Sequence, residues 1–448
     1  MITTTRLGST PAVADQYIRM TSFDDDRTLA DSSVDQQPKG STEASQAAPS
    51  STVISEDDLT LSEIPPSQVK EYHTGFFLAN LILRLWDEFK NSSQVNNQLP
   101  LLRPGFRPTM RRFRHMSTII KLNAAICAST FMFVLYILPV SVFVKLALFG
   151  ALSLLNTVPV LSQFFFYGMP VLAWVFLFFS AAKVPEAWRP PISVKFLPAM
   201  ENILYGDNLS DILAAYHNTF LDLLAWFPYG IVHFGGPFVV AALIWLFGPP
   251  TALRSYGWSF GYMNLLGVFI QQVGASAPPW YKNLYGLAAA HYGMSGSPGG
   301  LARIDELFGF DMYTTTFSTA PLIFGAFPSL HSACSTMSAL WLSYLFPKYT
   351  ACFVCYVCWL WWATMYLTHH YFFDLTAGSV LAVSFFYAAK FTSLPLKDPK
   401  CWCRFNYTQL KYFDTHAEDP LFESEELNNA SGLDAGFSMV EEPVIETI

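Results

Sequence analysis

The sequence predicts an all-α fold, a polytopic bundle of transmembrane helices with six to eight crossings. Of the 448 residues, 52% are hydrophobic and 13% are charged, whereas soluble domains carry about 25% charged residues. Several apolar runs reach the roughly 17–25 residues that a helix needs to span a bilayer. Basic residues flank the first and the last run, as they do at membrane boundaries. Lipid is therefore the solvent that this chain requires.

Polar and apolar residues divide the chain into three regions. Residues 1–100 are predicted to be a polar, disordered cytosolic tail, because the first 60 are rich in Ser, Thr, Asp and Pro. Residues 101–395 contain the apolar runs and form the predicted transmembrane domain, which also holds the candidate catalytic residues. Residues 396–448 are predicted to be an acidic cytosolic tail, since no Lys or Arg follows Lys411.

The predicted crossings follow one another along the central region. Residues 117–182 are almost continuously apolar, and prolines and an asparagine divide them into two or three crossings. A mixed segment, 183–217, and a polar stretch rich in Gly and Pro, 274–328, interrupt the later ones. These later crossings are predicted at residues 221–247, 257–273, 329–346, 351–367 and 375–391.

Positive charges set the predicted orientation of the chain in the membrane. Five arginines between residues 103 and 114 precede the first crossing, and Lys390, Lys397, Lys400 and Arg404 accompany the end of the last one. Both termini are therefore predicted to be cytosolic, which requires an even number of crossings.

Two short polar motifs each open one of the last predicted helices. The first is Pro-Ser-Leu-His-Ser at residues 328–332, and the second is His-His-Tyr-Phe-Phe-Asp at residues 369–374. Two crossings separate the motifs, so His331 and His370 return to the same face of the membrane, which the basic flanks make the lumenal one. Residues four apart share a helix face, so we expect Asp374 beside His370 and not beside His369.

Such a constellation favours phosphoryl-transfer chemistry by His331, His370 and Asp374. A carboxylate beside an imidazole fixes its tautomer and leaves the other nitrogen free as a nucleophile or base. A second histidine can donate a proton to a leaving group. Two alternatives stay open: ordinary interfacial histidines, or a metal site that also uses His369. No further cluster of ligands is evident, so neither a metal nor another cofactor is predicted.

The motifs resemble those of the type 2 phosphatidic acid phosphatase superfamily. The similarity is closer to one branch, the fungal inositol phosphorylceramide synthases or aureobasidin-resistance proteins. The stretches that carry it lie between about residues 120 and 395, at 197–210, 278–281, 297–305, 324–332 and 368–375.

This resemblance implies a fold, a reaction and a partner. The fold would contain a six-helix core of the phosphatase type. The reaction would be a step of sphingolipid synthesis in the Golgi membrane, in which phosphoinositol moves from phosphatidylinositol to ceramide and diacylglycerol is released. By the family's pattern, His370 is the nucleophile, Asp374 orients it and His331 handles the leaving-group proton. The family also implies a small membrane regulatory subunit as partner, and no nucleic acid.

The sequence departs from the wider superfamily at its cationic positions. The phosphatases carry Lys-x6-Arg-Pro upstream and Ser-Arg before the catalytic histidine. Here Thr364 stands six residues before His370, and only five residues separate Lys183 from Arg189. A phosphate monoester carries nearly two negative charges near neutral pH and a phosphodiester carries one. A site with fewer cations therefore favours a diester donor.

The predicted substrate-binding residues are Ser329, Ser332, Lys282 and Arg303. The two cations are candidates for the charge that binds the phosphate, although contacts with lipid headgroups or solvent alone would equally account for them. Two alternative functions stay open. The chain could be a lipid phosphate phosphatase with water as the acceptor, or a non-catalytic transporter or scaffold.

Overall fold

The computed structural model describes residues 76–94, 118–407 and 410–411. In these residues the regular elements are helices, and the only β-pairing consists of isolated bridges that join Ser193 to Ser276 and Ser276 to Gly325. The prediction of an all-α class is therefore confirmed for the described residues. The basic segment 103–114 and most of the acidic C-terminal tail lie outside them.

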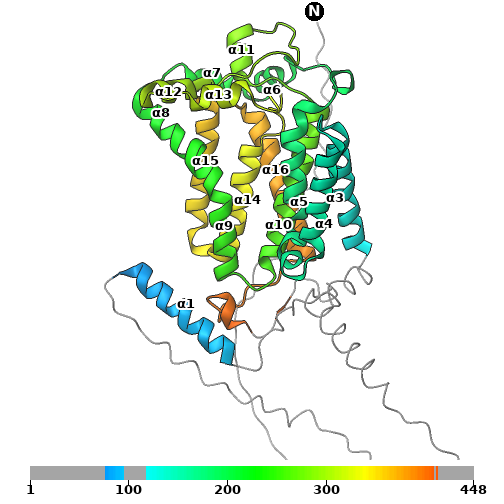
Figure 1. Cartoon of the computed structure of the whole chain (residues 1–448). Helices are drawn as coiled ribbons and strands as arrows, with labels where there is room; N and C mark the ends of the chain where they lie inside the picture. The colour runs from blue at the N-terminus through cyan, green and yellow to red at the C-terminus, as the bar shows by residue number, and fades with distance from the viewer. Residues whose placement is uncertain (1–75, 95–117, 408–409, 412–448) are drawn as a thin grey trace, which may run out of the picture. The chain divides into compact units, whose positions relative to one another are not determined.

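Long helices build the body of the molecule (Figure 1). Each of them falls on or beside a run that the sequence predicts to be apolar. In chain order they are α3 (Thr118–Ile137), α4 (Val142–Thr157), α5 (Pro159–Ser180), α8 (Thr219–Trp226) with the π-helical segment η4 (Phe227–Val232) and α9 (His233–Phe247), α10 (Ala252–Val273), α14 (Leu330–Leu345), α15 (Thr350–Tyr366) and α16 (Phe372–Thr392).

Four segments of the described chain are long and apolar enough to cross a membrane. They are Thr118–Ile137, Phe164–Lys183, Thr219–Phe247 and Phe372–Thr392, and the shorter Val142–Thr157 is also apolar. The protein is thus a multi-pass membrane protein. Helices α10, α14 and α15 occupy the other predicted crossings. They are shorter or less apolar, because buried polar side chains such as Asn264, Ser332 and Thr364 line them.

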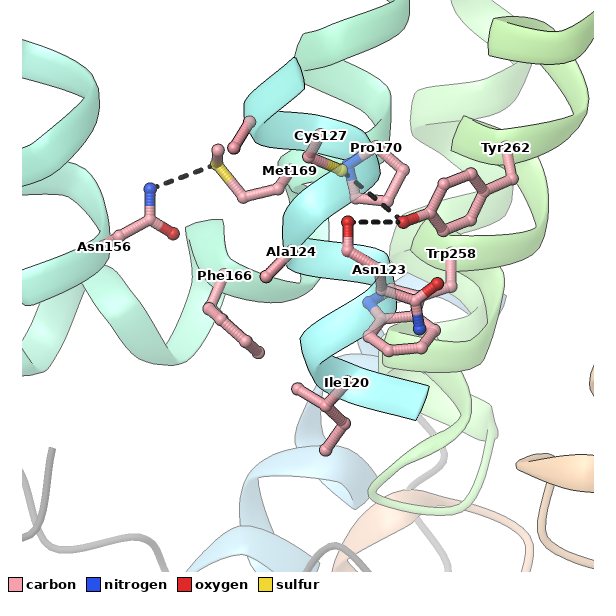
Figure 2. A pocket seen from close by; sticks show the side chains of 11 residues that line it. Ile120, Asn123, Ala124, Cys127, Asn156, Phe166, Met169, Pro170, Trp258 and Tyr262 are labelled. Carbon is pink, nitrogen blue, oxygen red and sulfur yellow. Dashed lines mark hydrogen bonds between the residues drawn. The ribbon is translucent and has the colours of Figure 1, made fainter. Parts of the chain in front are cut away.

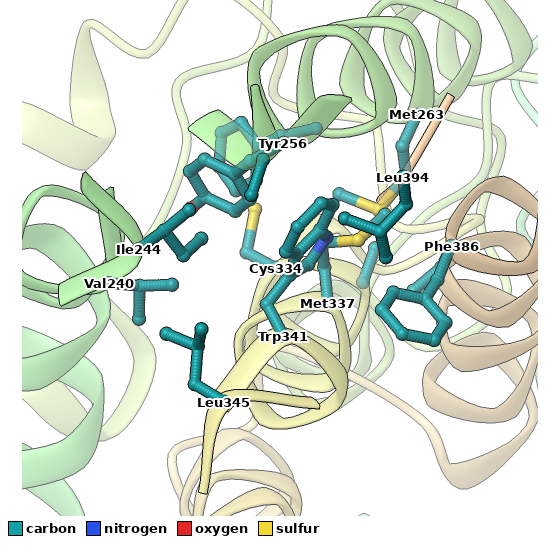
Figure 3. Packing of buried hydrophobic residues seen from close by; sticks show 14 residues of the cluster. Val240, Ile244, Tyr256, Met263, Cys334, Met337, Trp341, Leu345, Phe386 and Leu394 are labelled. Carbon is teal, nitrogen blue, oxygen red and sulfur yellow. The ribbon is translucent and has the colours of Figure 1, made fainter. Parts of the chain in front are cut away.

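Helix α14 packs against α9, α10, α15 and α16. Its buried side chains, among them Met337 and Trp341, meet Tyr256 of α10 and Phe386 of α16 in the largest apolar cluster (Figure 3). The indole of Trp341 lies edge-on to both of these rings. Since α14 begins within the first polar motif and α16 begins within the second, this packing brings the two motifs together.

The two polar stretches between the long helices contain short helices and 3₁₀ turns. Figure 1 shows α6, α7, α11, α12 and α13 gathered at one end of the long helices, where α14 begins and α15 ends. The short elements are η2 (Ala181–Lys183), η3 (Glu186–Trp188), α6 (Phe196–Tyr205), α7 (Leu209–Ala214), α11 (Pro279–Tyr285), η5 (Gly299–Leu301), α12 (Ala302–Phe308), α13 (Met312–Ser318) and, elsewhere, η6 (Pro347–Tyr349) and η7 (Arg404–Asn406). Helices α6, α7, α11, α12 and α13 thus cover the end of the bundle at which the two polar motifs lie (Figure 1).

The prediction that residues 1–100 are disordered is wrong for one stretch. Residues Phe77–Gln94 form helix α1. The stretch is amphipathic, with apolar residues recurring every three or four positions, and such a pattern forms a helix when one face can be covered. The other residues of this predicted tail lie outside the described part of the chain.

A small cavity lies between α3, α5 and α10, away from the polar motifs (Figure 2). Its volume is about 170 Å³, and its walls are almost entirely apolar. The few polar contacts at its rim are internal: the hydroxyl of Tyr262 donates to the carbonyl of Asn123 and meets the thiol of Cys127. We assign no chemistry to this cavity.

Candidate active site

The three residues predicted to be catalytic come together in space. His331 lies in the first turn of α14, and its Nδ1 is 3.0 Å from Nε2 of His370. Nδ1 of His370 lies 3.2 Å from Oδ1 of Asp374, facing it without an aligned hydrogen bond. His370 and Asp374 are buried, whereas His331 is partly exposed. The arrangement is a chain of carboxylate, imidazole and imidazole.

Helix α16 begins later than was assumed when the sequence was used to pair His370 with Asp374. Helix α16 begins at Phe372 with Tyr371 as its N-cap, so His370 precedes the helix and the helical i, i+4 premise is wrong. The pairing with Asp374 arises instead from the turn before the helix. Thr368 has a left-handed backbone (φ 62°), which reverses the chain, and Oδ2 of Asp374 accepts a hydrogen bond from the backbone N–H of Tyr371.

His369 points away from Asp374 and is held by other groups. Its Nε2 lies 3.0 Å from the carbonyl oxygen of Pro298, and its ring stacks on Tyr229 and Phe317. Burial lowers the pKa of His369 to about 3, so the ring is neutral and its Nε2–H donates to that carbonyl. Among the described residues, no group of three or more His, Cys, Asp or Glu side chains is arranged to hold a metal ion.

Two aromatic side chains that the sequence did not single out as functional line the site. Tyr229 stacks on the ring of His331, with centroids 4.6 Å apart, and the ring of His233 lies 4.4 Å from the same imidazole. Both come from the junction of η4 and α9, where the π-helical turn places them together. Such turns are frequent at functional sites. In the sequence they look like ordinary members of an apolar run.

The two serines of the first motif, Ser329 and Ser332, connect α14 to α16 by hydrogen bonds. Ser329 caps α14 by accepting from the N–H of Ser332, and its own N–H donates to the carbonyl of Asp374. The Ser332 hydroxyl donates to the carbonyl of Leu375 and meets the hydroxyl of Ser379. Both predicted substrate-binding serines are therefore engaged within the protein. Their contact with substrate stays a prediction.

Gly378 lets the two helices approach backbone to backbone. A Cβ atom at this position would lie 2.1 Å from the carbonyl oxygen of Ser329 and 3.2 Å from the N–H of Ala333. Real Cβ atoms never come so close to a backbone oxygen, so only glycine fits. The distance between His331 and His370 thus depends on a crossing point one or two turns away from each of them.

The two cations predicted to bind phosphate are engaged in ion pairs. Nζ of Lys282 lies 2.7 Å from a carboxylate oxygen of Asp211. The guanidinium of Arg303 donates two hydrogen bonds to Asp222, at 2.6 and 2.9 Å, and the hydroxyl of Tyr366 donates to the same oxygen. A role in binding phosphate stays a prediction for both cations, and each would have to share or leave its carboxylate.

Glu201 of α6 reaches the first turn of α16. Its Oε1 accepts a hydrogen bond from the backbone N–H of Phe372, while Oε2 is buried without a partner in the described residues. Burial is the main cause that raises the pKa of Glu201 to about 7. No role for this carboxylate was predicted, although it lies in the family-like stretch 197–210. Glu201 and Asp374 together satisfy consecutive N–H groups beside His370.

Comparisons with known proteins identify the family of the segment that contains these residues. The model of the PAP2 superfamily matches residues 197–388. The chain is 55% identical over 293 residues to the inositol phosphorylceramide synthase of Candida albicans, which covers 65% of this chain and 62% of that protein. It is 54% identical over 323 residues to the inositol phosphorylceramide synthase catalytic subunit AUR1 of Saccharomyces cerevisiae. These residues cover 71% of this chain and 80% of that protein.

A third relative extends the pattern. The inositol phosphorylceramide synthase catalytic subunit of Schizosaccharomyces pombe is 49% identical over 244 residues, which cover 54% of this chain and 58% of that protein. The chain thus spans less than two thirds of the Candida and Schizosaccharomyces proteins and four fifths of the Saccharomyces one. No solved structure matches the chain.

Proposed function

The chain belongs to the inositol phosphorylceramide synthases of the PAP2 superfamily, and from this premise we propose that it transfers phosphoinositol from phosphatidylinositol to ceramide. The products are inositol phosphorylceramide and diacylglycerol. The observation that carries the proposal is the chain of Asp374, His370 and His331, which lies within the family match at residues 197–388 in a protein about half identical to proteins of that name. Two imidazoles within reach of each other suit phosphoryl transfer, in which one attacks and the other moves a proton.

The proposed reaction has two steps, and protons balance in each. An ionised Asp374 favours the tautomer of His370 with its proton on Nδ1, which leaves Nε2 as the nucleophile. Nε2 attacks phosphorus, the bond to the diacylglycerol oxygen breaks, and protonated His331 gives that oxygen its proton. The ceramide hydroxyl then attacks the phosphoinositol-histidine, the P–N bond breaks, and neutral His331 accepts the hydroxyl proton. The competing mechanism has one step, in which the ceramide hydroxyl attacks phosphorus directly and His370 acts as the base.

Substrate must separate the two imidazoles before either step. In-line displacement puts the nucleophile and the proton donor on opposite sides of phosphorus. With ordinary attack and hydrogen-bond distances, their nitrogens are then roughly 7 Å or more apart. The observed separation is 3.0 Å. His331 is the partly exposed member of the pair, so its side chain is the one with room to turn aside.

The setting of the reaction also belongs to the proposal. The predicted range of six to eight crossings is met if α10, α14 and α15 cross the membrane with the apolar segments, and α14, α15 and α16 then belong to a six-helix core. An even number of crossings would put both termini on one side, and we propose from the basic flanks that this side is the cytosol, with the histidines on the lumenal face of the Golgi membrane. Two relatives are named catalytic subunits, which supports a small membrane regulatory subunit as partner.

The test is a lipid-transfer assay with the purified full chain, alone and copurified with any small subunit. Phosphatidylinositol and a fluorescent ceramide are supplied together, and phosphatidic acid is supplied separately. A fluorescent inositol phosphorylceramide that disappears in the His370→Ala variant supports the proposal. Release of free phosphate from phosphatidic acid would indicate the phosphatase. Binding of lipid without any product would indicate a non-catalytic transporter or scaffold.

Gly378→Ala is expected to lower turnover by about 100-fold. The new methyl group would collide with the backbone of Ser329, push α14 away from α16 and move the histidines. A shift of about 1 Å in a catalytic site lowers the rate by about 100-fold. The matched control is Gly150→Ala in α4, where a Cβ meets nothing within 4 Å. The initial rates of the two variants are compared. Equal activity would contradict the proposal that the close approach of α14 and α16 at Gly378 sets the distance between the histidines.

Glu201 is expected to make stability depend on pH. Its pKa is raised from 4.5 to about 7 in the folded protein, so folding favours the protonated form. This contribution to stability is complete below pH 4.5 and is lost as pH rises through 7. Glu201→Gln, which mimics the protonated acid, should flatten the fall in melting temperature between pH 5 and about 8. If the melting temperature of the Glu201→Gln variant fell with pH as steeply as that of the parent chain, Glu201 would be excluded as the cause of the fall.

A truncation at the same position separates charge from hydrogen bonding. Glu201→Ala leaves the N–H of Phe372 buried without an acceptor, and such a loss costs about 1–3 kcal/mol. We expect the Glu201→Ala variant to have a lower melting temperature than the Glu201→Gln variant at every pH.

A further inference from the structure

Helix α1 carries an exposed apolar face that the catalytic site does not use. Leu78, Ile82, Trp86 and Phe89 are 69%, 63%, 53% and 46% exposed. At 100° per residue these four positions fall within an arc of about 80°. Arg84, Asp87, Glu88 and Asn91 lie on the opposite side of the same helix. A soluble surface rarely presents so concentrated an apolar face, so the face needs an occupant.

The other side of α1 is fixed to the segment that follows the last long helix. Glu88 accepts a hydrogen bond from the side chain of Asn406 at 2.9 Å, and the Arg84 guanidinium lies over the ring of Trp402. The ring of Phe89, which belongs to the apolar face, also meets Phe405 edge-on. Helix α1 (blue in Figure 1) is therefore held beside η7 by two contacts of its polar side and by this one ring of its apolar face.

The segment around η7 is in turn fixed to the ends of membrane-spanning helices. The guanidinium of Arg404 lies over the ring of Trp245, and Trp402 contacts Phe247. Phe247 is the last residue of the candidate span Thr219–Phe247, and the span Phe372–Thr392 ends just before this segment. Helix α1 is thus held at the level where two spans leave the lipid.

We propose that α1 lies in the lipid–water interface of the membrane that the chain crosses, with its apolar face among the acyl chains. The position at the ends of two spans brings this face to the depth at which amphipathic helices insert. Trp86 on the face and Lys90 over its ring, 5.3 Å away, match the aromatic and basic residues that gather at membrane surfaces.

The test measures the depth of α1 in the full-length protein. A fluorescent amino acid replaces Ile82 on the apolar face or, as the matched control, Asn91 on the polar face. The protein is placed in nanodiscs of phosphatidylcholine and phosphatidylserine that contain lipid with a nitroxide near the headgroup. We expect quenching at position 82 to exceed quenching at position 91 several-fold. Equal quenching at the two positions would overturn the proposal.

A second pair of variants tests the cause of the contact. Trp86→Glu puts a charge into the apolar face and should reduce quenching at position 82 to the level at position 91. Asn91→Glu adds the same charge on the polar side and should leave quenching at position 82 unchanged. If quenching at position 82 survives Trp86→Glu, or vanishes once a copurified small subunit is present, the face binds something other than lipid and the proposal fails.

Discussion

His370→Ala is expected to abolish turnover, and His369→Gln is expected to retain most of it. Among the described residues, His370 is the histidine that faces His331 with one ring nitrogen and Asp374 with the other. His369 instead donates to the carbonyl of Pro298, and glutamine keeps a donor for that oxygen. The measurement is the initial rate of transfer to ceramide, together with labelled phosphoinositol trapped on the enzyme when ceramide is withheld.

The comparison needs folded protein in every case. His369 is buried between aromatic rings, so alanine there would open a cavity, and its loss of activity would be uninformative. Melting temperature and abundance in the membrane should match the parent chain for both variants. An active His370→Ala protein would remove this residue from the mechanism. The absence of trapped label under conditions that support turnover would favour direct attack by ceramide.

Asp374→Asn is expected to lower turnover by about 10⁴-fold, the loss seen when a triad carboxylate becomes an amide. The asparagine oxygen still accepts from the N–H of Tyr371, so the first turn of α16 keeps its cap. The new amide NH₂ faces Nδ1 of His370 and favours the tautomer with the proton on Nε2, which has no lone pair for phosphorus. The rate at saturating lipid, compared with the melting temperature, is the measurement. A loss below 10-fold with unchanged stability would contradict tautomer control.

The order and type of the helices followed from the sequence because the apolar runs are long. The segments around 221–247 and 375–391 appear as single spans within a few residues of the predicted bounds. The run 329–346 was predicted as a crossing and forms α14, in which buried hydroxyls such as Ser332 and Ser338 take the place of lipid-facing apolar residues. Helix α1 was missed since its charged and polar residues make it resemble a polar tail when hydropathy alone is considered.

The catalytic residues could be found from the sequence, but the reason for their pairing could not. The i, i+4 argument depended on a helix at His370, and the local turn at Thr368 set the geometry instead. Tertiary contacts were also invisible. Nothing in the spacing of Glu201 or Tyr229 shows that one reaches α16 and the other stacks on His331. Such partners are set by how distant helices pack, which a periodic pattern does not encode.

The short contact between His331 and His370 has a consequence for which molecules the enzyme consumes. Parting the imidazoles breaks a hydrogen bond, and the free energy for this step has to come from binding the rest of the lipid. A donor stripped of its acyl chains should for the same reason lose maximal rate and not only affinity, because the energy that opens the pair leaves with the chains.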